Sequence, residues 1–212
     1  MGIEFFLISY DLPNRTSFLP IYSFVDQHLN SRMFRRLPYP AITRRNSISS
    51  IVARICRQLS RRGDARYSLD VIRIYAHGSN NPDGEYSLRG MPVHILLGEG
   101  LTPTTARAFS GVSHLWHTTS PAGAPGSYLP PARPGGTNVG ANQAIRQIRP
   151  RIEMHACYAT NHARRTLQAL ASAARAPVFA ANALQVYNRE SAGPRWRMTN
   201  WNLEGTISGF YP

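Results

Sequence analysis

The sequence contains no lysine. All 24 of its basic residues are arginines, and they outnumber the 11 acidic residues, which gives a formal net charge of +13. Lysine is the residue that accepts ubiquitin and acetyl groups, and arginine is not, so the chain stays positively charged without offering a side-chain acceptor. Two explanations stay open here: the base composition of a GC-rich genome, or a bacterial effector or toxin that acts inside a eukaryotic cell.

Cysteine is scarce, and long apolar runs are missing. Cys56 and Cys157 are too few for a disulfide framework and show no Cys-x-x-Cys zinc spacing, which favours a reducing compartment. No run reaches the length of a transmembrane helix, and the first residues contain Glu4 and Asp11 but no basic region of a signal peptide. We therefore expect no transmembrane segment and a protein that is cytoplasmic or secreted without a cleaved Sec signal peptide, with delivery into a host or target cell as a further hypothesis.

What the sequence does contain predicts an α/β fold. A hydrophobic content of 42% over 212 residues suits a single domain, residues 1–212, with a true core. Apolar runs alternate with patterns of helical period, and this alternation predicts a mostly parallel central sheet flanked by helices on both faces. We expect strands at residues 3–10, 68–78, 149–158 and 177–187, and helices at residues 21–29, 46–63, 103–110 and 161–177.

Two further segments complete the predicted architecture. Residues 118–142 are rich in Pro, Gly, Ser and Ala, which indicates a long loop. Residues 195–212 alternate around Glu204 and Gly205, which predicts a C-terminal β-hairpin.

Two of the predicted strands end on residues that can carry out chemistry. The run "VIRIYAHG" ends at His77 and Gly78, and the run "IEMHAC" ends at Cys157. In a parallel sheet, ligand sites lie beyond the carboxyl ends of the strands. If the two strands are neighbours, His77 and Cys157 share one edge of the sheet.

A histidine next to a cysteine permits acyl transfer. A free thiol is mostly protonated at neutral pH, and an imidazole within reach can accept its proton. Cys157 would then attack a carbonyl, while His77 would act as the base and afterwards as the acid that protonates the leaving amine. The N–H groups of Gly78 and Cys157 are the natural donors to the oxyanion, because a residue without Cβ can approach the substrate closely.

With these two motifs the chain resembles the caspase-like cysteine peptidases of clan CD, which include caspases, legumains, clostripain and gingipains. It is also similar to bacterial caspase-like domains of uncharacterised function, over about residues 69–187. The resemblance implies a caspase-like fold, a His77–Cys157 dyad, an oxyanion hole at Gly78 and Cys157, a protein substrate and no cofactor. It implies that the protein is a cysteine endopeptidase.

The chain also departs from that family. Caspases have Gln-Ala-Cys-Arg-Gly around the nucleophile, whereas residues 155–159 are His-Ala-Cys-Tyr-Ala. No charged residue marks a first specificity pocket, so Asn182 and Gln185, after the third apolar strand, are the candidates for its wall. The alternative is a catalytically degenerate caspase-like domain that binds protein or nucleic acid, and the arginines would then attract an acidic partner.

Other residues near the two motifs have competing interpretations. His155, Cys157 and His162 could offer metal ligands, but three such ligands without an acidic partner would be unusual, so we expect no metal. Asp83 and Glu85 follow His77 and either orient its imidazole or are solvated loop acids. The oligomeric state is not predictable from these features.

Overall fold

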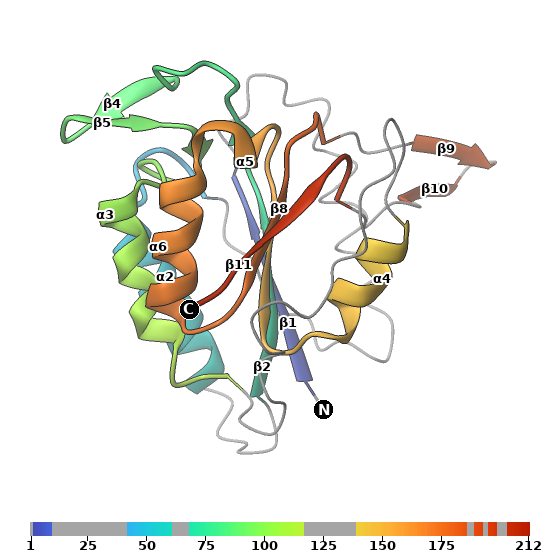
Figure 1. Cartoon of the computed structure of the whole chain (residues 1–212). Coiled ribbons are helices and arrows are strands. Elements are labelled where there is room, and N and C mark those ends of the chain that lie inside the picture. Colours follow the sequence, from blue (N-terminus) through green and yellow to red (C-terminus); the bar gives the residue numbers. More distant parts are fainter. Residues whose placement is uncertain are drawn as a thin grey trace.

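The computed structural model describes residues 2–9, 42–60, 68–116, 139–185, 189–192, 195–198 and 203–212, and its centre is a five-stranded sheet (Figure 1). The strand order is β1-β2-β7-β8-β11. The first four strands are parallel, and the last is antiparallel to its neighbour. The strands span β1 (Gly2–Ile8), β2 (Ser68–Tyr75), β7 (Arg151–His155), β8 (Val178–Ala181) and β11 (Ile207–Phe210). The predicted mixed α/β fold with a mostly parallel sheet is confirmed.

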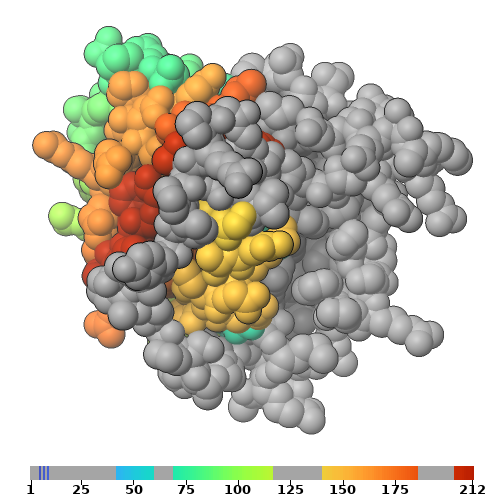
Figure 2. Space-filling view, turned by 45° about the vertical axis from the view of Figure 1, so that its right-hand side comes forward, coloured from blue at the N-terminus to red at the C-terminus, as the bar shows by residue number. Residues whose placement is uncertain are grey.

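Helices cover both faces of this sheet. One face carries α2 (Ile48–Ser60), α3 (Pro103–Ala106), the 3₁₀ helix η1 (Arg107–Val112) and α6 (Arg164–Ala174), and the other carries α4 (Val139–Gln147) (Figure 1). In Figure 2, which brings the second face forward, α4 lies at the surface. The short helix α5 (Ala159–His162) lies near the carboxyl ends of the parallel strands.

The first helix of the main layer, α2, forms where its sequence predicts. The Ser47 hydroxyl accepts the N–H of Ser50, and the Glu99 carboxylate accepts the N–H of Ile48, so two of the free N–H groups at the helix start are satisfied. The apolar face of α2 is buried at Ile48, Ile51, Val52 and Ile55, and Leu59 packs against the same core.

A capping box starts α3. The Thr102 hydroxyl accepts the N–H of Thr105, and the Thr105 hydroxyl accepts the N–H of Thr102. Pro103 follows at the first helical position, where its missing N–H costs nothing. The predicted helix at residues 103–110 is therefore confirmed as α3 continuing into η1.

The two faces of the sheet contribute to two apolar clusters. Ile72, Ile74, Ile152 and Met154 belong to the main core with α2, η1 and α6. On the opposite face, Phe179 and Ala181 of β8 pack with residues of α4 and with Leu203. Because each buried aliphatic or aromatic side chain stabilises the fold by about 1.5–3 kcal/mol, the main core outweighs the smaller cluster.

Two small hairpin-like ladders stand above the carboxyl ends of the strands. The strand β3 (His77–Gly78) pairs with β6 (Ile95–Leu96), and β4 (Tyr86–Leu88) pairs with β5 (Met91–Val93), both antiparallel. The tyrosine hydroxyl of Tyr86 donates to the carbonyl of Glu99 at 2.6 Å. This hydrogen bond links the β4–β5 ladder to the segment that precedes α3.

The C-terminal region differs from its prediction. The strand β10 (Arg195–Met198) pairs with β9 (Arg189–Ala192), while β11 joins the main sheet beside β8. Glu204 and Gly205 therefore connect two strands that belong to different sheets. The reason is burial. Ile207 and Phe210 of β11 are buried against the sheet, and an isolated two-stranded hairpin would leave such side chains exposed.

The predicted loop at residues 118–142 is wrong at its end, because α4 begins at Val139. Ala141 and Ile145 of this helix are buried, and that apolar spacing overrides the neighbouring glycines. Residues 118–138 and the predicted helix at 21–29 lie outside the described residues. None of the helices described above has the length and apolar character needed to cross a membrane.

Candidate active site

The carboxyl ends of β2 and β7 are neighbours. These strands pair in parallel from Val71 with Arg151 to Tyr75 with His155. The N–H of Ala76 continues the ladder by donating to the carbonyl of His155 at 3.2 Å. Two residues beyond this last pair lie His77 on one chain segment and Cys157 on the other. The two strand ends that the sequence singled out therefore meet at one edge of the sheet.

The surroundings of Gly78 independently show that the two strand ends are in contact. A Cβ atom at position 78 would lie 1.9 Å from the carbonyl oxygen of Cys157 and 2.6 Å from its nitrogen. Such distances are impossible for real atoms, so only glycine fits here. The main chains after His77 and at Cys157 are in direct contact.

The N–H of Gly78 points away from β6. Hydrogen-bonded and non-hydrogen-bonded pairs alternate along an antiparallel ladder. The N–H of Ser79 donates to His94 at 2.9 Å, so the next pair, Gly78 with Ile95, is the non-hydrogen-bonded kind. The N–H of Gly78 is consequently directed to the side of β3 that β6 does not occupy.

The thiol of Cys157 is partly exposed and has a main-chain donor. Its Sγ accepts the N–H of Gln185 at 3.4 Å, which places the positive end of an N–H dipole at the sulfur. Directly after it, Tyr158 adopts a left-handed conformation with φ of 53°, and its N–H donates to the carbonyl of Ala183 at 3.0 Å. This sharp turn ends the strand and starts α5, leaving the thiol at the sheet edge.

The imidazole of His77 is also accessible, with 33% of its side chain exposed, and its Nε2 lies 3.7 Å from a carboxylate oxygen of Glu85. The N–H of Glu85 donates to the carbonyl of Val93, so the β4–β5 ladder holds this acid in place. In the part of the chain that the structure describes, no hydrogen bond joins His77 to Cys157. The nearest partners are Glu85 for the imidazole and the N–H of Gln185 for the sulfur.

Asn182 and Gln185 form the segment beside the thiol. The Gln185 amide is buried and bonds to the main chain of Ala183 and Glu204, with its oxygen accepting the N–H of Glu204 at 3.1 Å. Asn182 is exposed, and its side-chain oxygen accepts the N–H of Thr206 at 2.9 Å. Both side chains therefore shape the loop next to Cys157, and direct contact with a substrate stays a prediction.

Further contacts join the loops that follow the two strands. The rings of His94 and His162 stack with centroids 5.6 Å apart, and the Asn161 amide donates to the Asn80 side chain at 2.7 Å. Burial, followed by the neighbouring His162, lowers the pKa of His94. These two contacts hold the loop after His77 against α5, which follows Cys157, beyond the carboxyl ends of the strands.

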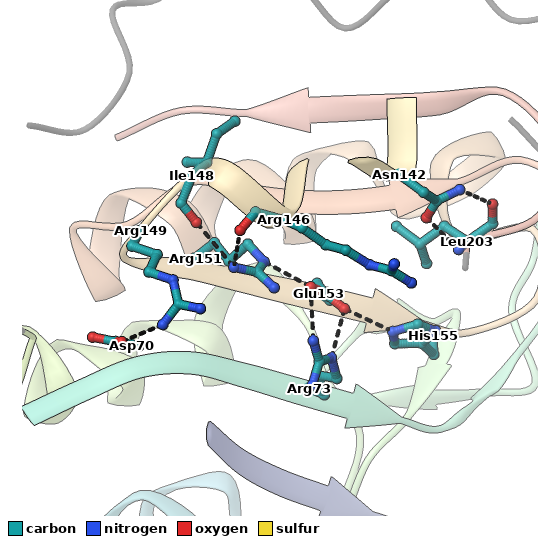
Figure 3. Close-up of polar contacts among 10 residues, drawn as sticks. All are labelled: Asp70, Arg73, Asn142, Arg146, Ile148, Arg149, Arg151, Glu153, His155 and Leu203. Carbon is teal, nitrogen blue, oxygen red and sulfur yellow. Dashed lines mark hydrogen bonds and ion pairs between the residues drawn. The ribbon is translucent and has the colours of Figure 1, made fainter. Parts of the chain in front are cut away.

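A buried charged network lies on the strands just below this edge (Figure 3). The Glu153 carboxylate accepts Nε of Arg73 at 2.8 Å and Nε of Arg151 at 2.6 Å, and it lies 3.2 Å from Nε2 of His155. The ring of His155 stacks on Tyr75 at 4.6 Å. We call Arg73, Arg151, Glu153 and His155 the Glu153 network.

This network also holds α4. The guanidinium of Arg151 donates to the carbonyls of Ile148, at 3.0 Å, and of Arg146. These carbonyls lie in the last turn of α4 and directly after it, where a positive charge is favourable. Arg151 therefore connects the sheet strand, the carboxylate and the helix on the second face.

Electrostatics define the charge state of the network. Burial acts to raise the pKa of Glu153, but Arg73, the hydrogen bond from His155 and Arg151 together hold it well below its ordinary value. Burial lowers the pKa of His155, and the Glu153 carboxylate opposes this only in part. Glu153 is therefore ionised and His155 neutral, with its Nε2–H donating to the carboxylate.

Sequence reasoning missed the Glu153 network. Its signal was an arginine in the middle of the apolar run "VIRIY" and a glutamate in the middle of "RIEMH". A buried charge needs a partner, so a lone arginine in one strand and a lone glutamate in another point to each other. Only the register of β2 against β7 shows that they are directly opposite.

His155, Cys157 and His162, which the sequence offered as possible metal ligands, make separate contacts. His155 belongs to the Glu153 network, and His162 stacks on His94. Among the described residues, no three His, Cys, Asp or Glu side chains are grouped so that they could hold a metal ion.

Comparison with known proteins finds no matching family model, no matching curated protein and no matching solved structure. The resemblance to caspase-like peptidases is therefore an expectation from the two short sequence motifs alone.

The contact at Gly78 predicts a steric effect of substitution. Gly78→Ala should lower the free energy of unfolding by more than about 1–3 kcal/mol, the usual cost of overpacking, because the new methyl group would overlap the main chain of Cys157. Urea denaturation measures this change. The matched control is Gly90→Ala, where φ is 79° and no atom lies near the added Cβ, so only a backbone cost of about 1 kcal/mol is expected. Equal losses in both variants would contradict the close approach.

The Glu153 network predicts a pH-dependent stability. Glu153→Gln leaves two guanidinium groups buried without their carboxylate and should lower the free energy of unfolding by about 3–5 kcal/mol at neutral pH. Because the pKa of Glu153 is depressed in the folded state, its stabilisation is present above the unfolded value of about 4.3 and is lost as pH falls through the folded value.

Urea denaturation measures the free energy of unfolding of the parent and of Glu153→Gln at neutral and at acidic pH. The difference between the two proteins should become smaller at acidic pH. Asp83→Asn, in an exposed turn, serves as the control and should change stability by less than about 0.5 kcal/mol. If the difference in unfolding free energy between parent and Glu153→Gln stayed constant across pH, an ionised Glu153 would not be the source of the lost stability.

Proposed function

We propose that this protein is a cysteine endopeptidase of the caspase-like type, with Cys157 as the nucleophile and His77 as the general base. The observation that carries the proposal is the direct contact of Gly78 with the main chain of Cys157 at the ends of two adjacent parallel strands. This main-chain contact supports a site in which the thiol, the imidazole and the glycine N–H share one edge of the sheet.

The first half of the reaction forms an acyl-enzyme. His77 takes the thiol proton as the sulfur of Cys157 attacks the peptide carbonyl carbon, and the carbonyl electrons move onto oxygen. The N–H groups of Gly78 and Cys157 stabilise this oxyanion. The C–N bond then breaks as the imidazolium gives its proton to the leaving amine, which produces a thioester on Cys157.

The second half regenerates the enzyme. Water attacks the thioester while His77 takes one of its protons, the C–S bond breaks, and the proton returns to the sulfur. The main-chain N–H of Gln185 supports both halves, because it donates to the sulfur whenever negative charge is present there. We assign Glu85, whose carboxylate lies 3.7 Å from the imidazole, the role of a positioning residue.

Thiol alkylation at neutral pH tests the dyad. Cys157 should react with iodoacetamide, and His77→Ala should slow that reaction by about tenfold or more, because the thiol loses its base. Cys56 is an internal reference: burial raises the pKa of its thiol, whose sulfur donates to the carbonyl of Gly111 at 3.3 Å, so it should react slowly in both proteins.

The matched control for the alkylation is His114→Ala, at an exposed position of the helical layer, which should leave the rate at Cys157 unchanged. Hydrolysis is then followed by mass spectrometry of unfolded protein substrates, with Cys157→Ala expected to abolish it. Equal rates of Cys157 alkylation in the parent and in His77→Ala would overturn the peptidase proposal and favour a domain that binds without cleaving.

The positioning role of Glu85 has a smaller expected effect. Glu85→Gln should slow alkylation of Cys157 by about two- to fivefold, the range for a partly exposed ion pair, because the imidazole can rotate more freely. Asp83→Asn removes a carboxylate of the same turn and should not change the rate. If Glu85→Asp alkylates at Cys157 as fast as the parent, the carboxylate positions the imidazole. An unchanged alkylation rate in Glu85→Gln would exclude this role.

A further inference from the structure

The outer side of the main helical layer is free of acidic residues. The helices α2, α3 with η1, and α6 lie side by side on one face of the sheet (Figure 1). None of them contains an aspartate or a glutamate. Their apolar residues face the main core, and their exposed side chains lie on the side away from it.

Arginines from all three helices lie on this outer side. Arg57 of α2, Arg107 of η1 and Arg165 of α6 are exposed, Arg54 is half-buried, and Arg175 is exposed directly after α6. We call these five residues the arginine face. Within the described ranges of the chain, no carboxylate pairs with any of them. Glu99, which precedes α3, accepts the N–H of Ile48 at the start of α2.

The residues between these arginines indicate what kind of partner fits. Most of the other exposed residues of these helices are small or hydroxyl-bearing, such as Ser49, Ser50, Ser110 and Ser172, and the exceptions are Gln168 and Arg164. The exposed large apolar side chains of the described residues, Met91 and Leu184, lie outside these helices. A protein interface needs apolar or aromatic anchors, membrane insertion needs an apolar face, and single-stranded nucleic acid needs stacking rings.

A phosphate backbone matches the remaining features. Guanidinium groups bind phosphate oxygens in a bidentate manner, and serine hydroxyls add hydrogen bonds without reading bases. The net charge of +13 adds long-range attraction to a polyanion. We propose that the arginine face binds the backbone of double-stranded nucleic acid without sequence preference. This binding is separate from the peptidase proposal and does not depend on it.

The test is the salt dependence of binding of the full chain to a fluorescent DNA duplex. The parent should bind, with affinity falling steeply between about 50 and 200 mM salt. The double variant Arg57→Gln with Arg107→Gln should weaken binding about tenfold and lower the slope of log affinity against log salt by about 0.9 for each phosphate contact removed. Circular dichroism should show the fold unchanged, because both side chains are exposed.

The matched control is Arg45→Gln with Arg89→Gln, which removes the same charge from exposed positions outside the three helices. This control should retain at least half of the parent affinity. An equal loss in both double variants would overturn the proposal in favour of net charge alone. No duplex binding, or binding to mixed phosphatidylcholine–phosphatidylserine vesicles without duplex binding, would also overturn it.

Discussion

The buried ion pair between Arg73 and Glu153 links the two central strands at directly opposite positions. Side chains alternate between the faces of a sheet, so a shift of one residue between β2 and β7 would move every side chain of one strand to the opposite face relative to the other. Such a shift would separate the buried Arg73 guanidinium from Glu153, which would keep only Arg151 and His155 of its own strand, at a cost of several kcal/mol. The network thus penalises the wrong alignments, whether or not it adds much net stability in the correct one.

The candidate active site inherits its geometry from this alignment. His77 and Gly78 lie two and three residues beyond the last strand pair on one side, and Cys157 lies two residues beyond it on the other. Above the sheet, the His94–His162 stack and the Asn80–Asn161 hydrogen bond hold the two loops together. The sulfur is therefore placed by strand packing below and loop packing above, and neither depends on a bound substrate.

Much of the fold was predictable because its parts follow local rules. The apolar face of α2, the Thr102 cap of α3 and the apolar runs of β2, β7 and β8 are all visible in short stretches of sequence. The site was predictable only as two strand ends, since adjacency of β2 and β7 is a property of the whole sheet. The Glu153 network, the N–H of Gln185 at the sulfur and the pairing of β11 with β8 depend on contacts between distant segments, which no local pattern encodes.

The contact at Gly78 has a consequence for how relatives of this chain should be interpreted. Any side chain at this position collides with the backbone beside Cys157, so the glycine is required by the fold itself. A descendant that had lost its thiol chemistry would still retain this glycine, for as long as it retained the sheet. The glycine therefore marks the architecture, whereas under the proposed mechanism an intact imidazole and thiol together would mark a chain able to cleave its substrate.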